Sequence, residues 1–454
     1  MSIKVLDCTF RDGGYYCDWN FHESIVKKYL KSISETNVDI VEIGFRFMPS
    51  SKFLGPFAYC SDDFLKSLQL PSGIDYAVMI NASDLINYDN GIDEAVCNLF
   101  SEKNESLVDI VRIAAHSKDL KSCEKIAKKL TTLGYRVFLN IMQISSLDSN
   151  SISHLARKVQ SWESIEVLYF ADSLGNMDSD SVSMIIKSIK KEWDGLIGIH
   201  THDNKNQALS NSLKAIEGGV TFIDATILGM GRGAGNARME DLLLELASRG
   251  FKKYYPDAIF PLVIDDFSVL KNKYEWGTNI YYFLSAMHNI HPTYIQEMLG
   301  DQRYDTDQKL SAISFLKSVG ASFYSNDHMI KAISGSEGSE KGSWSAKNWA
   351  KDHDVLIIGA GPSTKKYIHA IIEYIERNTP IVLCLNINEY IPNHLVTAYV
   401  ACRSSRLLID VGRYKKLKKP IILPLRNLPN ELKELLSGIE ILDYGIRIKN
   451  EAFE

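Results

Sequence analysis

The stretch LIGIHTHDNKNQALSNSLKAIEGGVTFIDATI (Leu196–Ile227) holds one complete unit of the pattern that decides the fold. An apolar run, Leu196–His200, is followed by a helix-like segment, Ala208–Glu217, and by a second apolar run, Phe222–Ile227. Short apolar runs bounded by polar residues are typical of strands that are buried on both faces, as in parallel sheets. We therefore interpret this stretch as a strand–helix–strand unit of a parallel α/β domain.

The same unit recurs through the first 250 residues. Earlier apolar runs, each an expected strand, are Ile3–Cys8, Ile40–Phe45, Tyr76–Ile80, Ile110–Ala115, Val137–Ile141 and Val167–Ala171. Eight strand–helix units in about 250 residues match the size of a (β/α)₈ barrel. A doubly wound open sheet has the same local pattern. We expect the α/β class, with a TIM barrel as the favoured architecture for residues 1–250.

The remaining sequence predicts three further parts. Residues 251–332 mix aromatic and polar residues at helical spacing and indicate a helical extension, in which Trp276–Tyr294 either covers the barrel mouth or forms a dimer surface. Residues 333–350 have the Gly- and Ser-rich composition of a linker. Residues 351–454 predict a small, doubly wound, Rossmann-like α/β domain. Its expected strands are Val355–Ile358, Ile381–Leu385, Ala398–Ala401, Leu407–Ile409, Ile421–Leu423 and Ile439–Leu442.

Composition excludes several classes of protein. The 51 Lys and Arg against 56 Asp and Glu give a net charge of −5, which argues against binding to nucleic acid or an anionic membrane. No apolar run approaches the roughly 20 residues that span a bilayer. The first residues lack the apolar core of a signal peptide. Seven cysteines without a CxxC pair fit reduced thiols, and we expect a cytoplasmic protein.

A candidate metal site lies in GIHTHDN. His200 and His202 are two residues apart at a strand end, so their imidazoles point to the same side. Asp12 is expected at the end of the first strand, and strands one, seven and eight are neighbours in a closed barrel. One carboxylate and two imidazoles at the carboxyl-terminal rim form a three-ligand site with open positions. The alternative is a pair of hydrogen-bonded histidines without a metal.

Two further elements of the rim suit this site. Arg11, beside Asp12, offers a fixed fork of donors to a developing oxyanion, and Glu42, expected at the end of strand two, can hold that fork. The glycine-rich loop Leu228–Glu240 permits close backbone approach to a ligand and carries Asn236, whose amide can reach a metal or a substrate. A flexible loop is the alternative for this segment.

Polar residues are also expected at the ends of most other strands, where a purely structural rim would not need them. Each of them alone is an ordinary loop cap. They are Asn81, His116, Asn140, Asp172 and Ser173.

Together these motifs carry a resemblance. FRDGG, VEIGF, VRIAAH, FADSLGNM, GIHTHDN and GRGAGNA, in this order, resemble the HMG-CoA lyase-like (DRE-TIM metallolyase) superfamily of metal-dependent TIM barrels over residues 1–250. VRIAAH and ADSLGNM are most similar to the 4-hydroxy-2-oxovalerate aldolases. The resemblance implies that Arg11 stabilises an enolate, and that Asp12, His200 and His202 bind a divalent metal with Asn236 in or beside its coordination sphere.

The resemblance also implies a reaction. A 4-hydroxy-2-oxo acid is cleaved to pyruvate and an aldehyde, or the two are condensed. The ligand set suits Mn²⁺, Mg²⁺ or Co²⁺, and the aldolases favour Mn²⁺. These aldolases carry a histidine base after the RDG motif, where this chain has Tyr15; Tyr16, His116 or a metal-bound water are competitors for that role.

Two other functions are compatible with the sequence. One is a Claisen-type synthase that joins an acyl-CoA and a 2-oxo acid, and the other is a catalytically inert barrel that acts as a binding module. In the C-terminal domain, Gly359, Gly361 and Ser363 follow a strand and precede a helix, so they are candidates to bind a nucleotide or nucleotide-sugar phosphate. Their spacing does not complete either the dinucleotide or the Walker A motif.

Overall fold

The computed structural model describes residues 3–49, 51–301, 304, 306–334, 342–402, 404–425, 428 and 430–445. The chain forms two compact units: Met1–Gln302 with Gly320–Tyr324, and Arg303–Val319 with Ser325–Glu454. The predicted helical extension is thus divided between them. Part of the predicted linker, 335–341, lies outside the described residues.

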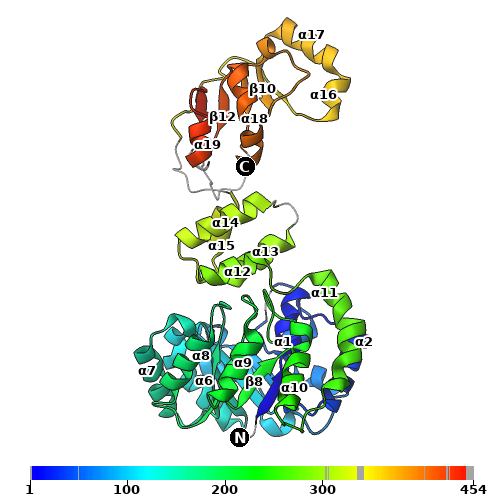
Figure 1. The fold of residues 1–454 in the computed structure, drawn as a ribbon, viewed down its shortest axis with the longest axis vertical. Coiled ribbons are helices and arrows are strands. Elements are labelled where there is room, and N and C mark those ends of the chain that lie inside the picture. The colour runs from blue at the N-terminus through cyan, green and yellow to red at the C-terminus, as the bar shows by residue number, and fades with distance from the viewer. Residues whose placement is uncertain are drawn as a thin grey trace. The chain divides into compact units, whose positions relative to one another are not determined.

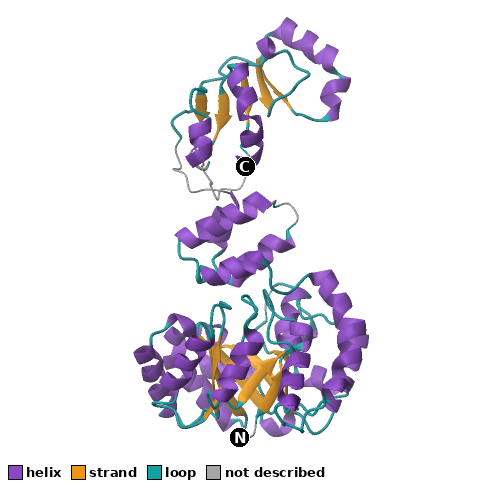
Figure 2. Ribbon diagram, in the orientation of Figure 1, coloured by secondary structure: helices purple, strands orange, loops and turns teal. Residues whose placement is uncertain are grey.

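The first unit contains a closed barrel of parallel strands, which confirms the predicted TIM barrel. Each strand pairs with the next along the chain, and β8 pairs with β1. The strands lie inside a ring of helices (Figure 2). They are β1 (Lys4–Asp7), β2 (Ile40–Phe45), β3 (Asp75–Asn81), β4 (Ile110–Ala115), β5 (Arg136–Ile141), β6 (Val167–Ala171), β7 (Leu196–His200) and β8 (Phe222–Ala225).

The helices around the barrel are amphipathic and bury their apolar faces against the strands. Side-chain caps fix where several begin: Asp148 accepts the Ser151 N–H at the start of α7, and Asp178 accepts the Ser181 N–H at the start of α8. The helices are α1 (Thr9–Gly13), α2 (Glu23–Glu35), α3 (Asp62–Ser67), α4 (Ala82–Ile86), α5 (Ile92–Leu99), α6 (Leu120–Thr132), α7 (Ser149–Gln160), α8 (Ser179–Ile189), α9 (Ala208–Glu217) and α10 (Met239–Ser248) (Figure 1).

Two residues expected at strand ends lie elsewhere. Asp12 is in α1, one turn beyond β1, because the chain bends into a short buried helix directly after Cys8. Glu42 is in the middle of β2, where the pairing register with β3 shifts between Glu42 and Gly44. Both side chains are nevertheless buried, and both contact Arg11.

The barrel interior is layered. An apolar cluster fills it and contains Leu6, Ile40, Ala77, Ile110, Phe138, Val167, Tyr169 and Phe222, together with Cys8. The guanidinium carbon of Arg112 lies 4.3 Å from the centre of the Tyr169 ring. The charged side chains of the site therefore rest on a closed apolar base, which keeps water out from below.

The segment after α10 packs on the mouth loops of the same barrel. Trp276 Nε1 donates to the Leu228 carbonyl at 3.0 Å, and Gly233 N–H donates to Gln296 Oε1 at 3.0 Å. Gln143 Nε2 donates to the Ser322 carbonyl at 2.8 Å. Of the two roles predicted for Trp276–Tyr294, the structure shows contact with the mouth loops. The helices here are α11 (Ser268–Tyr274), α12 (Ile280–Met287) and α13 (Pro292–Gly300), preceded by a π-helical turn at Leu262–Phe267.

The second unit contains a five-stranded parallel sheet in the order β13-β12-β11-β10-β9, which confirms the predicted parallel α/β class. The predicted doubly wound order is not found, because the strands follow in sequence and the described sheet has no reversal point. The strands are β9 (Val355–Ile358), β10 (Ile381–Leu385), β11 (Ala398–Val400), β12 (Ile421–Leu423) and β13 (Ile441–Asp443).

The predicted strand at Leu407–Ile409 is wrong, because these residues belong to helix α18 (Ser404–Leu417). Leu407 is buried whereas Leu408 and Ile409 are 53% and 77% exposed, so the run was an apolar edge of an amphipathic helix. The helices of this unit are α14 (Thr306–Ser318), α15 (Asn326–Ser334), α16 (Pro362–Lys366), α17 (Ile368–Asn378), α18 (Ser404–Leu417) and α19 (Asn430–Leu435).

Two predictions from composition can be compared with the whole of the described chain. None of its helices combines the length and the apolarity needed to cross a bilayer. All seven cysteines are free thiols.

Candidate metal centre at the barrel rim

Three buried side chains converge at the carboxyl-terminal rim. Asp12 Oδ2 lies 3.8 Å from His200 Nε2 and 3.7 Å from His202 Nε2. Neither Nε2 atom has a hydrogen-bond partner, although both are buried. Buried polar atoms are rarely left without partners unless a ligand is missing. One carboxylate and two unpartnered imidazole nitrogens fit a divalent cation, and they form a candidate metal site.

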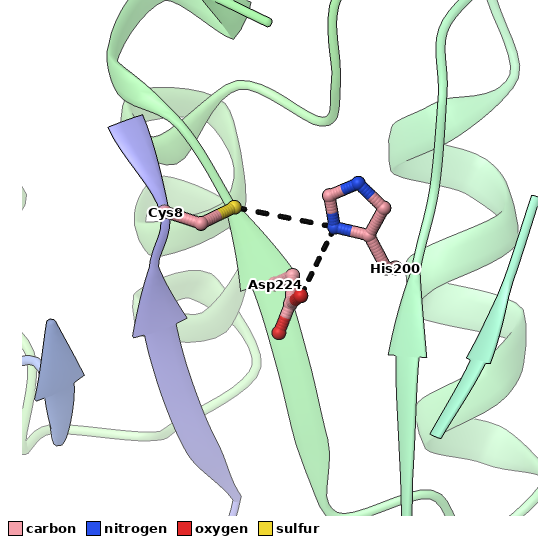
Figure 3. A group of neighbouring side chains, drawn as sticks. All are labelled: Cys8, His200 and Asp224. Carbon is pink, nitrogen blue, oxygen red and sulfur yellow. Dashed lines mark hydrogen bonds and ion pairs between the residues drawn. The ribbon is translucent and has the colours of Figure 1, made fainter. Parts of the chain in front are cut away.

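His200 is oriented by a carboxylate on the next strand. Its Nδ1 lies 3.0 Å from Asp224 Oδ2 and 4.0 Å from Cys8 Sγ, which approach from β8 and from the end of β1 (Figure 3). Because a carboxylate accepts, Nδ1 carries the proton and Nε2 presents its lone pair to the site. Burial lowers the pKa of His200 to about 4, so this ring is neutral and able to ligate.

His202 is oriented in the same sense by the backbone. Its Nδ1 donates to the Asp172 carbonyl oxygen at 2.8 Å, which again leaves Nε2 as the free nitrogen. Hydrogen bonds at Nδ1 thus fix the tautomer of both histidines that leaves Nε2 free to bind a metal.

Cys8, His200 and Asp224 form a second group of potential ligands. Asp224 is already bound to a guanidinium, and burial raises the pKa of the Cys8 thiol well above its usual value. A neutral thiol and an occupied carboxylate do not hold a cation. These two side chains therefore position His200.

Arg11 and Glu42 complete the ligand side of the site. Arg11 Nη1 donates to Asp12 Oδ1 at 2.6 Å, and Arg11 Nε donates to Glu42 Oε2 at 2.7 Å. Burial raises the pKa of Asp12, but Arg11 and the two imidazoles outweigh this and hold it well below its usual range. Arg11 Nη2 is buried and has no partner. One arm of the fork is thus available to a ligand.

Arg112, at the centre of β4, closes this charged network. It donates to Glu42 Oε2 at 3.1 Å and to Asp224 Oδ2 at 2.7 Å, and its side chain is fully buried. Burial raises the pKa of Asp224, yet Arg112 and His200 lower it below its usual value. The candidate metal ligands Asp12 and His200 are thus connected through alternating acidic and basic groups around the barrel interior.

Asn236 and Gly231 bring the loop after β8 onto the site. Asn236 Nδ2 donates to Asp12 Oδ2 at 2.6 Å, while its Oδ1 is buried without a partner. A Cβ added to Gly231 would lie 2.6 Å from Asp12 Oδ2, closer than real contacts allow. Glycine at 231 therefore lets the loop approach the candidate metal ligands closely.

The cavity around the triad is lined by several of the predicted residues. Asn81, Asn140, Ser173 and Tyr15 all face it, with the apolar side chains of Phe45, Met79 and Met142 between them. The Asn140 amide oxygen is buried without a partner. Burial raises the pKa of Tyr15 above its ordinary value of 10, against the opposing effect of Arg232.

Asp172 and His116 are among the predicted residues that do not line this cavity. Asp172 accepts the backbone N–H groups of Asn176 and Met177, and its role at the site is the carbonyl that orients His202. His116 follows β4 and lies with its ring centre 5.4 Å from that of Phe323. Burial lowers the pKa of His116, so this imidazole is neutral at pH 7.

Three residues of the site were missed by sequence reasoning. Arg112 and Asp224 are charged residues inside runs expected to be buried on both faces. Because a buried charge needs a buried partner, these two residues could have been recognised from the sequence as members of a buried charged network. Arg232 lines the cavity, but its position in the glycine-rich loop did not indicate this, because an arginine in such a loop can equally be exposed to solvent.

The predicted phosphate-binding residues are in the second unit. Gly359 and Gly361 lie between β9 and the five-residue α16, and Ser363 is within that helix. A Cβ at Gly359 would meet nothing within 4 Å, so the protein itself does not require glycine there. Nucleotide binding at this turn stays a prediction.

Comparison with known proteins agrees with this geometry. Residues 105–258 match the family described as HMGL-like. The crystal structure of the N-terminal domain of a candidate aldolase from Bacteroides vulgatus is 33% identical, with a TM-score of 0.59; the match covers 66% of this chain and 98% of that one. The 4-hydroxy-2-oxovalerate aldolase of Carboxydothermus hydrogenoformans is 26% identical over 55% of this chain and 72% of that protein. The oxaloacetate decarboxylase of Mycobacterium tuberculosis is 21% identical over 54% and 70%.

The fold and the site define a (β/α)₈-barrel enzyme with a candidate divalent-metal centre at its carboxyl-terminal rim. The chain belongs to the HMGL-like family.

Proposed function

We propose that this protein is a divalent-metal-dependent aldolase that cleaves a 4-hydroxy-2-oxo acid to pyruvate and an aldehyde, or condenses the two. The observation that carries the proposal is one cavity in which two free imidazole nitrogens, the Asp12 carboxylate and a free arm of Arg11 meet. Relatives named as 4-hydroxy-2-oxovalerate aldolases support the same substrate class.

Asp12, His200 and His202 would hold the cation, with Asn236 beside them. When bound, a divalent cation supplies Lewis acidity and a template for the 2-oxo acid. The oxygen and imidazole ligands suit Mn²⁺, Mg²⁺ or Co²⁺, and we favour Mn²⁺.

Arg11 stabilises the charge that cleavage creates. When the C3–C4 bond breaks, its electron pair forms the C2–C3 double bond of pyruvate enolate, and the negative charge moves to the C2 oxygen. Arg11 Nη2 is free to donate to that oxygen, while Asp12 and Glu42 hold the rest of the guanidinium in place. A donor fixed before the reaction is worth about 10²–10³ in rate.

Tyr15 is our candidate for proton transfer at the C4 hydroxyl. It lines the cavity, and within the described residues its hydroxyl forms no hydrogen bond. As base, the phenolate takes the hydroxyl proton as the C4–O bond becomes a carbonyl. Protonation of C3 of the enolate then yields pyruvate.

The pH profile separates Tyr15 from His116 as the base. The pKa of Tyr15 is raised above 10, so kcat/KM is expected to increase with pH through the neutral range, and Tyr15→Phe should remove this increase. With His116 as the base, activity would level off at a pH below 6.5, because its pKa is lowered. A Tyr15→Phe profile that matches the wild type would exclude Tyr15.

The function is tested by metal-dependent pyruvate release from 4-hydroxy-2-oxopentanoate. Asp12→Asn and His200→Ala should abolish both Mn²⁺ binding and pyruvate release while leaving the circular dichroism spectrum unchanged. Turnover that persists in either variant would remove the proposed site. Release of free thiol from acetyl-CoA and a 2-oxo acid would instead indicate a Claisen-type synthase.

A further inference from the structure

Arg232 is a second guanidinium in the cavity that holds the metal ligands. Its Nε is buried without a hydrogen-bond partner, and no ion pair or hydrogen bond of its guanidinium occurs among the described residues. The proposed cleavage does not use it. Removing a charged side chain from water without a partner is costly, so an unpaired arginine that faces a cavity indicates that a ligand pairs with it.

This lack of a partner distinguishes Arg232 from the other arginines of residues 3–301. Each of the others forms an ion pair with an aspartate or glutamate within 4.0 Å: Arg11, Arg46, Arg112, Arg136, Arg157, Arg238 and Arg249. Arg232 alone in this range lacks one, although it is partly buried.

The loop fixes Arg232 beside the metal ligands. Its chain neighbour Gly231 is so close to Asp12 that a Cβ would clash with the carboxylate. The guanidinium carbon lies 5.8 Å from the centre of the Tyr15 ring, which itself lines the cavity. Tyr16 holds the following residue, because its hydroxyl donates to the Gly233 carbonyl at 2.6 Å.

Two imidazoles that lie close enough to Arg232 to be affected by its charge, His116 and His291, are neutral. Burial, together with the positive charge of Arg232, lowers the pKa of both His116 and His291, so neither imidazole is charged at pH 7. His291 is the N-cap of α13, the helix that packs on the same loop. Two neutral imidazoles and one guanidinium offer donors, and no carboxylate of the described residues competes for them by an ion pair.

The net charge of the side chains at the site indicates how many negative charges a bound substrate should carry. The charged network contains two guanidiniums, those of Arg11 and Arg112. They form ion pairs with three carboxylates, Asp12, Glu42 and Asp224, so the network has one net negative charge. A divalent cation changes this to one positive charge, and the carboxylate of a 2-oxo acid neutralises it. The charge of Arg232 then remains, and a substrate with a second anionic group would neutralise it.

We propose that Arg232 binds a terminal carboxylate or phosphate of the substrate, at the end away from the 2-oxo acid. The aldehyde partner of the reaction is accordingly an anionic one. This inference rests on the proposed aldolase function and narrows its substrate class.

Binding of a matched pair of acids tests the inference without turnover. 2-Oxoglutarate and 2-oxopentanoate have the same chain length, differ in the terminal carboxylate, and lack the 4-hydroxyl needed for cleavage. Calorimetric titration of the Mn²⁺-loaded protein should show 2-oxoglutarate bound about 10- to 100-fold more tightly, as expected for a charged hydrogen-bonded contact.

Substitutions of Arg232 test whether this residue causes the preference for 2-oxoglutarate over 2-oxopentanoate. Arg232→Gln should reduce it to within about twofold, whereas Arg232→Lys should keep part of it. Arg238→Gln is the matched control, because this exposed arginine on the same loop forms its ion pair with Asp241 away from the cavity. Equal binding of the two acids by the wild type, or an unchanged preference in Arg232→Gln, would overturn the inference.

Condensation with pyruvate distinguishes the two anions. Succinic semialdehyde against butanal tests a carboxylate, and glyceraldehyde 3-phosphate against glyceraldehyde tests a phosphate. The preferred anion should lose about 10- to 100-fold in kcat/KM in Arg232→Gln, with the KM for pyruvate unchanged. Turnover with neutral aldehydes only would overturn the inference and leave the aldolase function intact. No turnover with any aldehyde, together with selective binding of 2-oxoglutarate, would refute the aldolase function instead.

Discussion

Replacing Asp224 by Asn tests whether the charged network behind the metal ligands sets metal affinity. The substitution keeps the shape of the side chain and an oxygen for His200 Nδ1, but it removes the negative charge between Arg112 and His200. We expect weaker binding of Mn²⁺, because a carboxylate behind a ligating imidazole raises its basicity and fixes its orientation.

The magnitude follows from the contacts. Loss of a partner behind a ligating histidine typically reduces metal affinity by about 10- to 100-fold. Stability should fall as well, because Arg112 is fully buried and loses one of its two carboxylates. Glu42 remains as a partner, so we expect a loss of about 1–3 kcal/mol rather than the roughly 3–5 kcal/mol of a fully broken buried pair.

The assay is a Mn²⁺ titration by calorimetry on folded wild type and variant, with thermal unfolding of both apo proteins alongside. Asp39→Asn is the control, because this ion-paired carboxylate precedes β2 at the opposite end of the barrel and contacts Lys4 and Lys253. It should lower stability without changing Mn²⁺ affinity.

An Asp224→Asn protein with wild-type Mn²⁺ affinity would refute this reasoning. The network would then serve stability alone, and the orientation of His200 would come from its backbone and neighbours. A loss of affinity as large in Asp39→Asn would also refute it, because that result would mean a general weakening of the barrel.

The remaining predictions concern the loop, the pH and the metal. Gly231→Ala should weaken Mn²⁺ binding in a folded protein, because its Cβ would lie 2.4 Å from Asn236 Nδ2 and 2.6 Å from Asp12 Oδ2 and would displace these side chains, whereas Gly359→Ala, with open space around it, should have no effect. Burial raises the pKa of Asp7 to about 6, so the contribution of Asp7 to the unfolding free energy should fall by about 3 kcal/mol as the pH rises from about 4 to above 6. Asp7→Asn should make the decrease in unfolding free energy over that pH range smaller than in the wild type, and an equal decrease in the variant would contradict the assignment. Chelation of the metal should lower the melting temperature of the wild type but not of Asp12→Asn.

Much of the barrel was readable from local sequence. Runs such as Ile40–Phe45 and Val167–Ala171 coincide with β2 and β6, because a strand buried on both faces must be apolar throughout. The choice between a closed barrel and an open sheet was weaker, since both share this pattern. The run at Leu407–Ile409 failed, because three residues cannot distinguish a strand from the edge of a helix.

The candidate ligands were predictable for a similar reason. His200 and His202 are two residues apart at a strand end, and this spacing is local information. The partners of these histidines were not predictable, because Asp224 and Asp172 come from other strands and their distances depend on closure of the barrel. The predicted position of Glu42 at the end of strand two was wrong, because Glu42 is in the middle of β2. Its predicted contact with Arg11 is nevertheless present.

By itself, the sequence determined the parallel α/β class, the positions of most strands along the chain and the residue types of the rim, because each of these depends on patterns within a few residues. Only the tertiary structure decided that β8 closes on β1, that Arg112 joins Glu42 to Asp224, and that Arg232 faces the cavity without a partner. These facts depend on which side chains meet across the barrel. Electrostatic contacts act over a few ångströms in space, and spacing along the chain does not contain that distance.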